Sequence, residues 1–360
     1  MTIVKNRLII SNVINVFALQ KRKRIDNMVK WFLAILFFPL SISAQVQRYK
    51  FTQPKMGSYF TIIFYDSDSL HANKIAEESF ALVDSLNEIY SDYLQNSELN
   101  RLCATAGKQQ WVTVSPAFLD ILLRSGQAWK LSKGSFDITV GPAVRIWRKA
   151  RKENKFPDKD SVTYAMQSVG FQYVLIDTIN KKAQLTKQGM QLDLGGIGQG
   201  YIGQKVLDHL GKNNITVALV DVSGDIITGD APPGKQGWSI AVNVPESADE
   251  LLDKKIFIHN RSVSTSGDVY QFIIHDGKKY SHIVNPKTGY GITNQRNVTV
   301  IAADGTTADW FTKACSILSI REVRRLAKKL NAEFLIGTLK KGKFRFYQSK
   351  NFKKYQSKRD

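Results

Sequence analysis

The segment LDLGGIGQGYIGQKVLDHL constrains the fold more than any other part of this 360-residue chain. An apolar strand pattern runs directly into four glycines, Gly195, Gly196, Gly198 and Gly200, and a helical pattern follows at once. Glycines at a helix entrance permit close backbone approach, and they let amide N–H groups face an anion that the helix dipole favours. The spacing matches neither the P-loop nor the G-x-G-x-x-G motif. By itself the segment fits a phosphate-binding turn and a tight packing turn equally well.

The remaining pattern mixes strands and helices without regular βαβ alternation. Helical spacing covers residues 72–91 and 115–134, and Ser115 followed by Pro116 suits the start of the second helix. Further helices are expected at 198–213, 307–318 and 321–331, and strands at 49–65, 172–177, 182–196, 214–230, 238–245, 262–286, 297–304 and 332–347. This mixture predicts an α+β fold with mixed sheets and flanking helices.

Several local features carry more specific expectations. The strand at 49–65 is expected to be interrupted at Met56-Gly57 by a close backbone approach or a bulge, and Asp276-Gly277 is expected to turn a β-hairpin. The charged residues 150–163 are expected to form a surface insert. The two cysteines, at 103 and 315, match no metal-binding spacing, so we expect free, buried thiols.

The N-terminal residues have the pattern of a targeting signal. From Met28 the sequence has Lys30 as a basic start, an apolar stretch at 31–40, and small residues before Gln45. The apolar stretch is too short to cross a bilayer and suits a cleavable signal peptide. We therefore expect residues 1–44 to be an N-terminal extension and signal peptide, and the protein to be exported to the periplasm.

The formal net charge of +20 is concentrated at the chain ends. The segment from Lys340 to Asp360 has nine Lys or Arg residues against one Asp. Residues 45–340 are expected to form one domain, and 341–360 a basic C-terminal tail. Such a tail suits a solvated end, anionic lipid, an acidic partner or nucleic acid. Because the body has no nucleic-acid motif or aromatic-lined basic groove, we expect no nucleic-acid partner.

Three later segments place small residues and one ionisable group at strand ends. They contain Asp225 (VSGDI), Thr265, Ser266 and Asp268 (STSGD) and His282 (SHIVNPKTG). Hydroxyls and amide N–H groups in such places suit a chain that wraps a polyanionic ligand. His282 could contact a phosphate or move a proton, or it could be structural.

Eight segments in order resemble the ApbE family of FAD:protein FMN transferases: MGSYF, SDYLQNSELNRL, GSFDITVGPAVRIW, LDLGGIGQGY, ALVDVSGDI, SVSTSGD, YSHIVNPKTG and TTADWFTKACSIL. The resemblance spans about residues 50–320. It implies an ApbE-like fold and an exported enzyme that uses FAD and Mg²⁺. Such an enzyme joins FMN through a phosphoester to a Thr or Ser of a target protein and releases AMP. The targets typically include subunits of membrane redox complexes, and some relatives hydrolyse FAD to FMN and AMP.

The resemblance also implies roles for individual residues. The catalytic candidates are His282 and Asp309. The metal is assigned to Asp309, to the Gly198 carbonyl and to the position of Lys313. The residues assigned to the cofactor are Met56, Ser91, Tyr93, Asp137, Gly195, Gly196, Gly198, Gly200, Asp225, Thr265, Ser266, Asp268 and His282.

Lys313 departs from the family, which usually has a Thr ligand four residues after the metal-binding acid. An ammonium cannot bind a cation and repels one at close range. In one interpretation Asp309 and Gly198 hold Mg²⁺ while Lys313 turns away. In a second, Lys313 pairs with Asp309 and replaces the metal, which gives an FAD-binding protein with little or altered activity. FAD pyrophosphatase activity is a further alternative. The sequence leaves these interpretations open.

Overall fold

A computed structural model describes residues 46–245, 251–266, 272–340 and 343–356. The expected signal peptide at 1–44 and the predicted cofactor residue Asp268 therefore lie outside the described residues. Within the described part, no helix has the length and apolar character needed to cross a bilayer.

An eight-stranded antiparallel sheet forms the centre of the fold. Its strands, in spatial order, are β1 (Gln47–Lys55), β2 (Ser58–Asp66), β6 (Ala218–Val222), β7 (Asp225–Thr228), β10 (Ser262–Ser266), β13 (Arg296–Ala302), β14 (Glu333–Lys340) and β15 (Lys343–Gln348). Together with its helices the sheet confirms the predicted α+β class.

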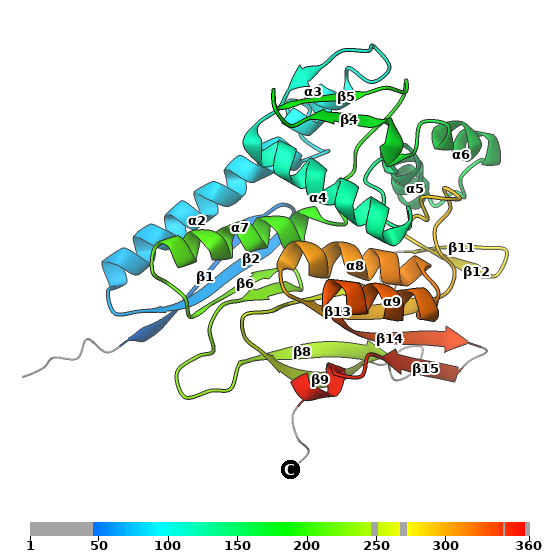
Figure 1. The fold of residues 1–360 in the computed structure, drawn as a ribbon. Coiled ribbons are helices and arrows are strands. Elements are labelled where there is room, and N and C mark those ends of the chain that lie inside the picture. The colour runs from blue at the N-terminus through cyan, green and yellow to red at the C-terminus, as the bar shows by residue number, and fades with distance from the viewer. Residues whose placement is uncertain (1–45, 246–250, 267–271, 341–342, 357–360) are drawn as a thin grey trace, which may run out of the picture. The chain divides into compact units, whose positions relative to one another are not determined.

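Helices cover one face of the sheet, and a hairpin packs on the other (Figure 1). The covering helices are α2 (Ser69–Tyr90), α7 (Gly198–Lys212), α8 (Gly305–Ile317) and α9 (Ile320–Leu330), with α4 (Pro116–Ser132) against α2 and α8. The hairpin is β8 (Trp238–Pro245) and β9 (Leu251–Ile258). Trp238 and Ile256 of this hairpin are buried against Val263 and Ile301 of the sheet.

Smaller elements surround one end of these layers. They are α3 (Glu98–Cys103), α5 (Gly141–Glu153), α6 (Lys159–Met166), the sheet of β3 (Val112–Thr113), β5 (Lys182–Leu185) and β4 (Val174–Asp177), the hairpin of β11 (Phe272–His275) and β12 (Lys278–Ser281), and the short 3₁₀ turn η1 (Phe171–Tyr173). A second 3₁₀ turn, η2 (Phe352–Tyr355), packs beside β9 and β14. Asp276-Gly277 turns the β11–β12 hairpin, as predicted.

The helix signals in the sequence were largely correct. The Ser115 side chain caps α4 by accepting the Phe118 N–H, and Pro116 is the first helical residue. The α2 helix buries Ile75, Phe80 and Val83, which follow the predicted apolar stripe. This spacing works because residues three and four apart lie on one face of a helix.

Two local predictions were wrong. Met56 and Gly57 form the turn of a β1–β2 hairpin, with φ angles of 54° and 76°, instead of a bulge within one strand. Positive φ at both central positions gives a tight turn whose twist matches paired strands. The segment at 150–163 is not an insert, because α5 extends to Glu153 and α6 begins at Lys159. The polar faces of these short helices resemble an exposed loop in sequence.

Part of the predicted basic tail belongs to the folded body. The predicted closing hairpin is present as β14 and β15, and residues 343–348 form the last strand of the main sheet. Phe352 is completely buried beside the β8–β9 hairpin. Both cysteines, Cys103 and Cys315, are free and buried, as expected.

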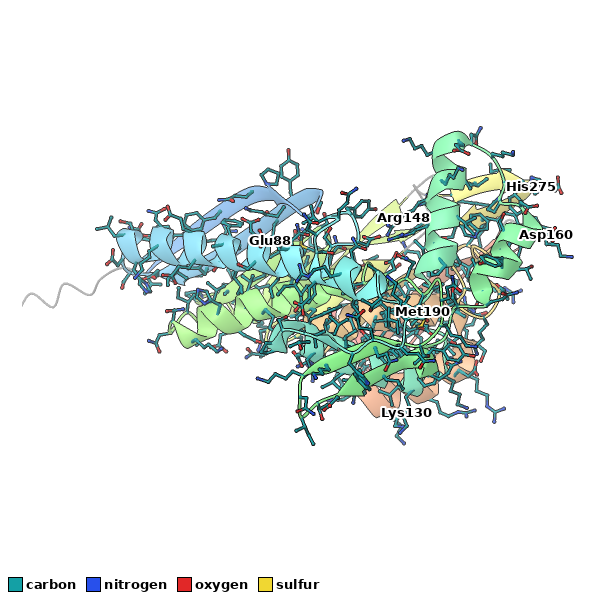
Figure 2. The ribbon with its side chains drawn as sticks, turned by 90° about the horizontal axis from the view of Figure 1, so that it is seen from above. Glu88, Lys130, Arg148, Asp160, Met190 and His275 are labelled. Carbon is teal, nitrogen blue, oxygen red and sulfur yellow. The ribbon has the colours of Figure 1, made fainter. Side chains whose placement is uncertain are left out.

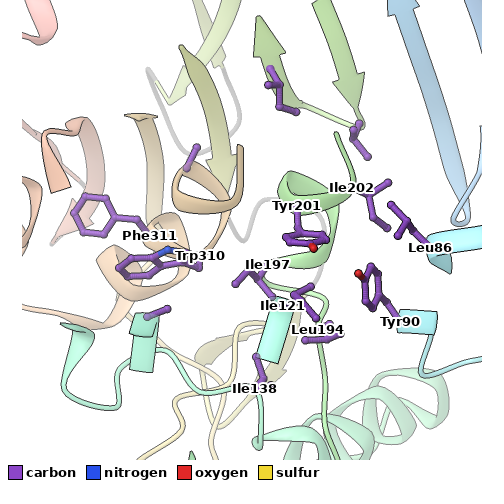
Figure 3. Packing of buried hydrophobic residues seen from close by; sticks show 14 of the residues in the cluster. Leu86, Tyr90, Ile121, Ile138, Leu194, Ile197, Tyr201, Ile202, Trp310 and Phe311 are labelled. Carbon is purple, nitrogen blue, oxygen red and sulfur yellow. The ribbon is translucent and has the colours of Figure 1, made fainter. Parts of the chain in front are cut away.

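The main core lies between the sheet and the helices (Figure 3). The Tyr90 and Tyr201 rings, from α2 and α7, meet edge to face with centroids 5.6 Å apart. The Tyr201 hydroxyl donates to Asp120 Oδ2 at 2.7 Å, so the buried phenol keeps a partner. This packing fixes the start of α7 against α2.

Candidate functional site

Two adjoining cavities lie over the entrance to α7. The larger, about 710 Å³, is lined in part by Met56, Ser91 and Gly198. The smaller, about 230 Å³, is lined in part by Phe136, Asp137, Gly196, His282 and Lys313. Both are lined by Tyr93, Arg148 and Gly195, so they meet there. We call the segment from Gly195 to Gly200 at the start of α7 the glycine turn, and the two cavities together the glycine-turn cleft.

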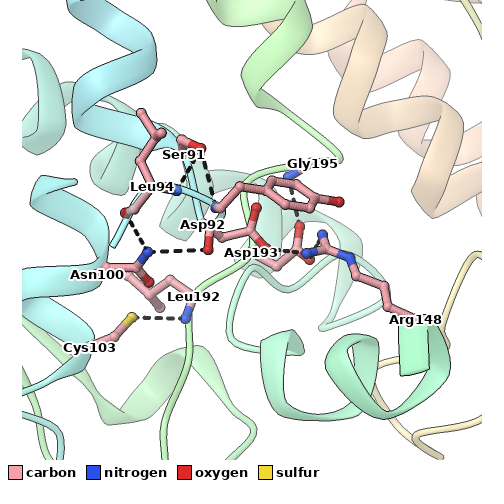
Figure 4. A network of polar contacts seen from close by, with 10 residues as sticks. Ser91, Asp92, Leu94, Asn100, Cys103, Arg148, Leu192, Asp193 and Gly195 are labelled. Carbon is pink, nitrogen blue, oxygen red and sulfur yellow. Dashed lines mark hydrogen bonds and ion pairs between the residues drawn. The ribbon is translucent and has the colours of Figure 1, made fainter. Parts of the chain in front are cut away.

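Arg148 lies where the two cavities meet and contacts residues of two other segments (Figure 4). Arg148 forms an ion pair with Asp92, and its Nη2 donates to Asp193 Oδ2 at 2.8 Å. Its guanidinium carbon lies 4.8 Å from the centroid of the Tyr93 ring, in a cation–π contact. The Tyr93 side chain is 77% exposed, so a ligand can reach this ring.

The same network shapes the glycine turn. Asp193 Oδ1 accepts the Gly195 N–H at 2.8 Å while Oδ2 binds Arg148. Burial raises the pKa of Asp193, and the nearby Arg148 charge opposes that rise. Burial lowers the pKa of Arg148, but Asp193 and Asp92 more than offset this and raise it. The turn entering α7 is therefore tied to a fixed positive charge.

Helix α5 carries Arg148 and stands beside the β11–β12 hairpin (Figure 2). Trp147 Nε1 donates to the Gly289 carbonyl at 2.8 Å, and the Trp147 ring is buried. The Phe156 ring, just beyond the helix, stacks on His275 with a centroid distance of 3.9 Å. These contacts hold Arg148 at the cleft and link it to the SHIVNPKTG segment.

Three charged side chains, Asp309, Lys313 and Asp225, lie close together next to the glycine turn. Asp309 is completely buried, and its Oδ2 accepts the Gly200 N–H at 3.0 Å. Its Oδ1 accepts from Lys313 Nζ at 2.6 Å. Burial and the neighbouring Asp309 charge raise the pKa of Asp225 to about 7. Burial lowers the pKa of Lys313, but Asp309 and Asp225 outweigh that effect and raise it.

The space around two of the four glycines separates a packing role from a place in the cleft. A Cβ on Gly200 would lie 2.1 Å from the Gly305 carbonyl oxygen, so α7 and α8 cross with almost no space between their backbones. A Cβ on Gly196 would lie 3.2 Å from the Phe136 ring and 3.3 Å from Lys313 Cγ. The packing interpretation therefore applies to Gly200, while Gly195, Gly196 and Gly198 line the cleft.

The residues near Asp309, as they stand, do not fit a divalent cation. Mg²⁺ needs several oxygen ligands at about 2.0–2.1 Å in octahedral geometry. Both Asp309 oxygens accept hydrogen bonds from this chain, and the Lys313 ammonium stands where a cation would bind Oδ1. Among the described residues, no three His, Cys, Asp or Glu side chains are grouped to hold a metal.

Asp137 has a local structural role. Its Oδ1 accepts from the Thr139 N–H at 2.8 Å and the Thr139 hydroxyl at 2.6 Å, and its Oδ2 accepts the Phe171 N–H at 3.0 Å. Burial raises the pKa of Asp137, and these hydrogen bonds oppose the rise. Asp137 therefore holds the loop that forms one wall of the smaller cavity.

The other predicted residues lie around these groups. His282 is half-buried and lines the smaller cavity, and Gly198 is the first residue of α7 in the larger one. Thr265 Oγ1 lies 3.1 Å from Thr299 Oγ1 on the next strand, and Ser266 is buried. The roles assigned to these side chains remain predictions.

The sequence reading missed the Asp92–Arg148–Asp193 network. Asp92 and Asp193 lie inside segments that were singled out, but neither was named. Arg148 follows directly after the GSFDITVGPAVRIW segment and falls on a helix that was not predicted. One feature of the sequence could have indicated Asp193: this acid lies two residues before Gly195, within an otherwise apolar strand pattern.

Comparisons with known proteins identify the family of this chain. A sequence model of the ApbE family matches residues 56–336. The chain is 29% identical over 291 residues to the FAD:protein FMN transferase of Haemophilus influenzae, covering 78% of this chain and 84% of that protein. It is 24% identical to the FAD:protein FMN transferase of Escherichia coli K12, covering 83% and 87%.

Solved structures give the same result. The flavin transferase ApbE of Vibrio cholerae superimposes with a TM-score of 0.78 at 25% identity, covering 86% of this chain and all of that one. The ApbE protein of Thermotoga maritima gives 0.77 at 26% identity, covering 87% and all of it. The family match covers well over half of the sequence, so the chain belongs to the ApbE family.

Proposed function

We propose that this protein is an FAD:protein FMN transferase. The main structural support is that two cavities of about 710 and 230 Å³ meet at Arg148, Tyr93 and Gly195. FAD has two planar ring systems joined by a diphosphate. An elongated cleft with positive charge and backbone N–H groups near its middle suits that molecule. The curated relatives of this chain carry the same activity in their names.

In this proposal the diphosphate lies over the entrance of α7. Arg148 and Lys313 line the cleft there, and the residue before α7, Ile197, has no side chain that could cap the helix. The helix dipole and the two cations attract the diphosphate. Tyr93 offers an exposed ring for stacking on one of the planar groups, with Met56 on the wall of the same cavity.

The proposed reaction joins FMN to a Thr or Ser hydroxyl of a target protein. The hydroxyl oxygen forms a bond to the FMN phosphorus, and the bond from that phosphorus to the bridging oxygen breaks. AMP leaves with the bridging oxygen and receives the proton that the hydroxyl loses. His282, on the wall of the smaller cavity, is our candidate for moving that proton. Phosphoryl transfer of this kind depends mainly on positioning and charge neutralisation.

The family resemblance implies Mg²⁺, but the residues that would hold it are already paired with each other. The proposed reaction therefore has no step on a metal ion.

We also propose that the protein is exported and acts on an exported subunit of a membrane redox complex. The pattern from Met28 to Gln45 and the family resemblance support this assignment. Peripheral membrane contact through the basic C-terminal residues belongs to the same proposal.

The test is a labelling experiment. The full chain is incubated with FAD and an acceptor peptide containing one Thr, and the products are analysed by mass spectrometry and chromatography. We expect the peptide to gain the mass of one FMN and free AMP to appear in equal amount. The same peptide with Val in place of the Thr should gain nothing. AMP without labelled peptide would identify an FAD pyrophosphatase instead.

A further inference from the structure

Each Asp309 carboxylate oxygen already accepts a hydrogen bond from this chain. The carboxylate is completely buried, with Gly200 N–H 3.0 Å from Oδ2 and Lys313 Nζ 2.6 Å from Oδ1. Asp309 and Lys313 are four residues apart on α8, so the helix itself brings the two side chains together.

The Lys313 stem is packed in this orientation. It crosses Gly196, where a Cβ would lie 3.3 Å from Lys313 Cγ and 3.9 Å from Cε. The Phe136 ring lies against the same glycine, 3.2 Å from that Cβ position. Gly196 therefore provides the space that the lysine stem needs. Only 22% of the Lys313 side chain is exposed, which agrees with a held conformation instead of one turned out to solvent.

The ammonium also lies where a bound diphosphate would need positive charge. Lys313 lines the smaller cavity together with Gly195, Gly196, Arg148 and His282. A lysine ammonium is a compact charge with three N–H donors, and lysine binds phosphate in this way in other proteins. One donor goes to Asp309. A fixed cation can neutralise phosphate charge without the ligand geometry that Mg²⁺ requires.

We infer that the Lys313 ammonium is a built-in cation that excludes a divalent metal from Asp309 and faces the FAD diphosphate, so this chain binds FAD without metal. The part concerning FAD rests on the proposed function. The exclusion of the metal rests only on the Asp309–Lys313 pair and can be tested separately.

The first experiment measures the metal directly. The full chain is titrated with Mn²⁺, a spectroscopic substitute for Mg²⁺, with and without FAD, and free Mn²⁺ is followed by electron paramagnetic resonance. We expect the wild type and its Asp309→Asn variant to bind the same amount of Mn²⁺, because Asp309 of the wild type holds none. Lys313→Thr opens the position and offers a hydroxyl, so this variant should bind about one Mn²⁺ that the second substitution, Asp309→Asn, abolishes.

The second experiment measures FAD affinity by flavin fluorescence in EDTA and in excess Mg²⁺. The wild type should show the same affinity within about twofold in both. Lys313→Thr should lose at least about tenfold in EDTA and recover with Mg²⁺. The matched control is Lys205→Thr, because Lys205 also pairs with an aspartate, Asp120 Oδ2 at 3.0 Å, but does not line the cleft. This control should behave as the wild type does.

Each outcome decides one question. Asp309-dependent Mn²⁺ binding by the wild type overturns the inference, and so does a tenfold loss of wild-type FAD affinity in EDTA. FAD binding by Lys313→Thr that ignores metal also overturns it, because Lys313 would then not be the cation. If the wild type binds no FAD under any condition, the proposed function fails, and the Mn²⁺ titration of the wild type still decides the exclusion of metal.

Discussion

Lys313 and Asp309 form an ion pair with Nζ 2.6 Å from Oδ1, and the aspartate is completely buried. The second Asp309 oxygen binds the Gly200 N–H, so the pair connects α8 to the glycine turn at the start of α7. The relationship bears on both stability and ligand binding, because the same lysine lines the cleft.

We expect Asp309→Asn to destabilise the fold. Removing one partner of a buried pair costs about 3–5 kcal/mol, and the partial exposure of Lys313 reduces this to about 2–3 kcal/mol. Urea unfolding followed by circular dichroism measures the change. Asp84→Asn is the control: Asp84 also pairs with a lysine at 2.6 Å but is 56% exposed, so its loss should cost less than about 1 kcal/mol. Equal costs for the two variants would contradict the prediction.

Gly200→Ala should destabilise the protein by about 3 kcal/mol or more, because its methyl group would lie 2.1 Å from the Gly305 carbonyl oxygen. Gly211→Ala on the same helix is the matched control, since no atom lies within 4 Å of the added Cβ. That control should raise stability by up to about 1 kcal/mol through helix propensity. Thermal denaturation of the two variants should therefore shift in opposite directions, and a shared direction would refute the packing role.

Arg148→Lys should weaken FAD binding about tenfold. A lysine ammonium lacks the planar fork that reaches Asp92 and Asp193 together, and it stacks less well on Tyr93. Fluorescence titration with FAD measures the affinity. Arg124→Lys serves as control, because Arg124 pairs with a carboxylate on α4 outside the cleft. Unchanged affinity in Arg148→Lys would remove Arg148 from the proposed site.

The contribution of Asp225 to stability should fall as the pH rises from about 4 to 7. The pKa of Asp225 is raised from 3.8 to about 7 in the folded protein by burial and the Asp309 charge. Between these values the folded state binds more protons than the unfolded state, so this group lowers the free energy of unfolding as pH increases. Above pH 7 the loss from Asp225 is complete. Asp225→Asn should flatten this part of the profile and increase stability at pH 8.

The measurement for Asp225 is the unfolding free energy at several pH values. Asp208→Asn, at an exposed position on α7, should keep the wild-type slope. The prediction fails if Asp225→Asn follows the wild-type profile through this window.

Local pattern was sufficient for most of the fold. The apolar stripe of α2, the Ser115 cap with Pro116, and the Asp276-Gly277 turn depend on neighbours within a few residues, so the sequence predicts them directly. The prediction at Met56-Gly57 was wrong because the same alternating pattern suits one interrupted strand or two paired strands. Only the pairing of β1 with β2 distinguishes them.

The sequence by itself identified the α+β class, the family resemblance, the glycine turn and the importance of the Asp309–Lys313 spacing. It could place those two side chains on one helical face, because helix periodicity fixes that relationship. It could not show whether Lys313 turns toward Asp309 or away, nor that Arg148 joins Asp92 to Asp193. Those contacts depend on space left by Gly196 and on segments far apart in sequence, and only the tertiary packing brings these together.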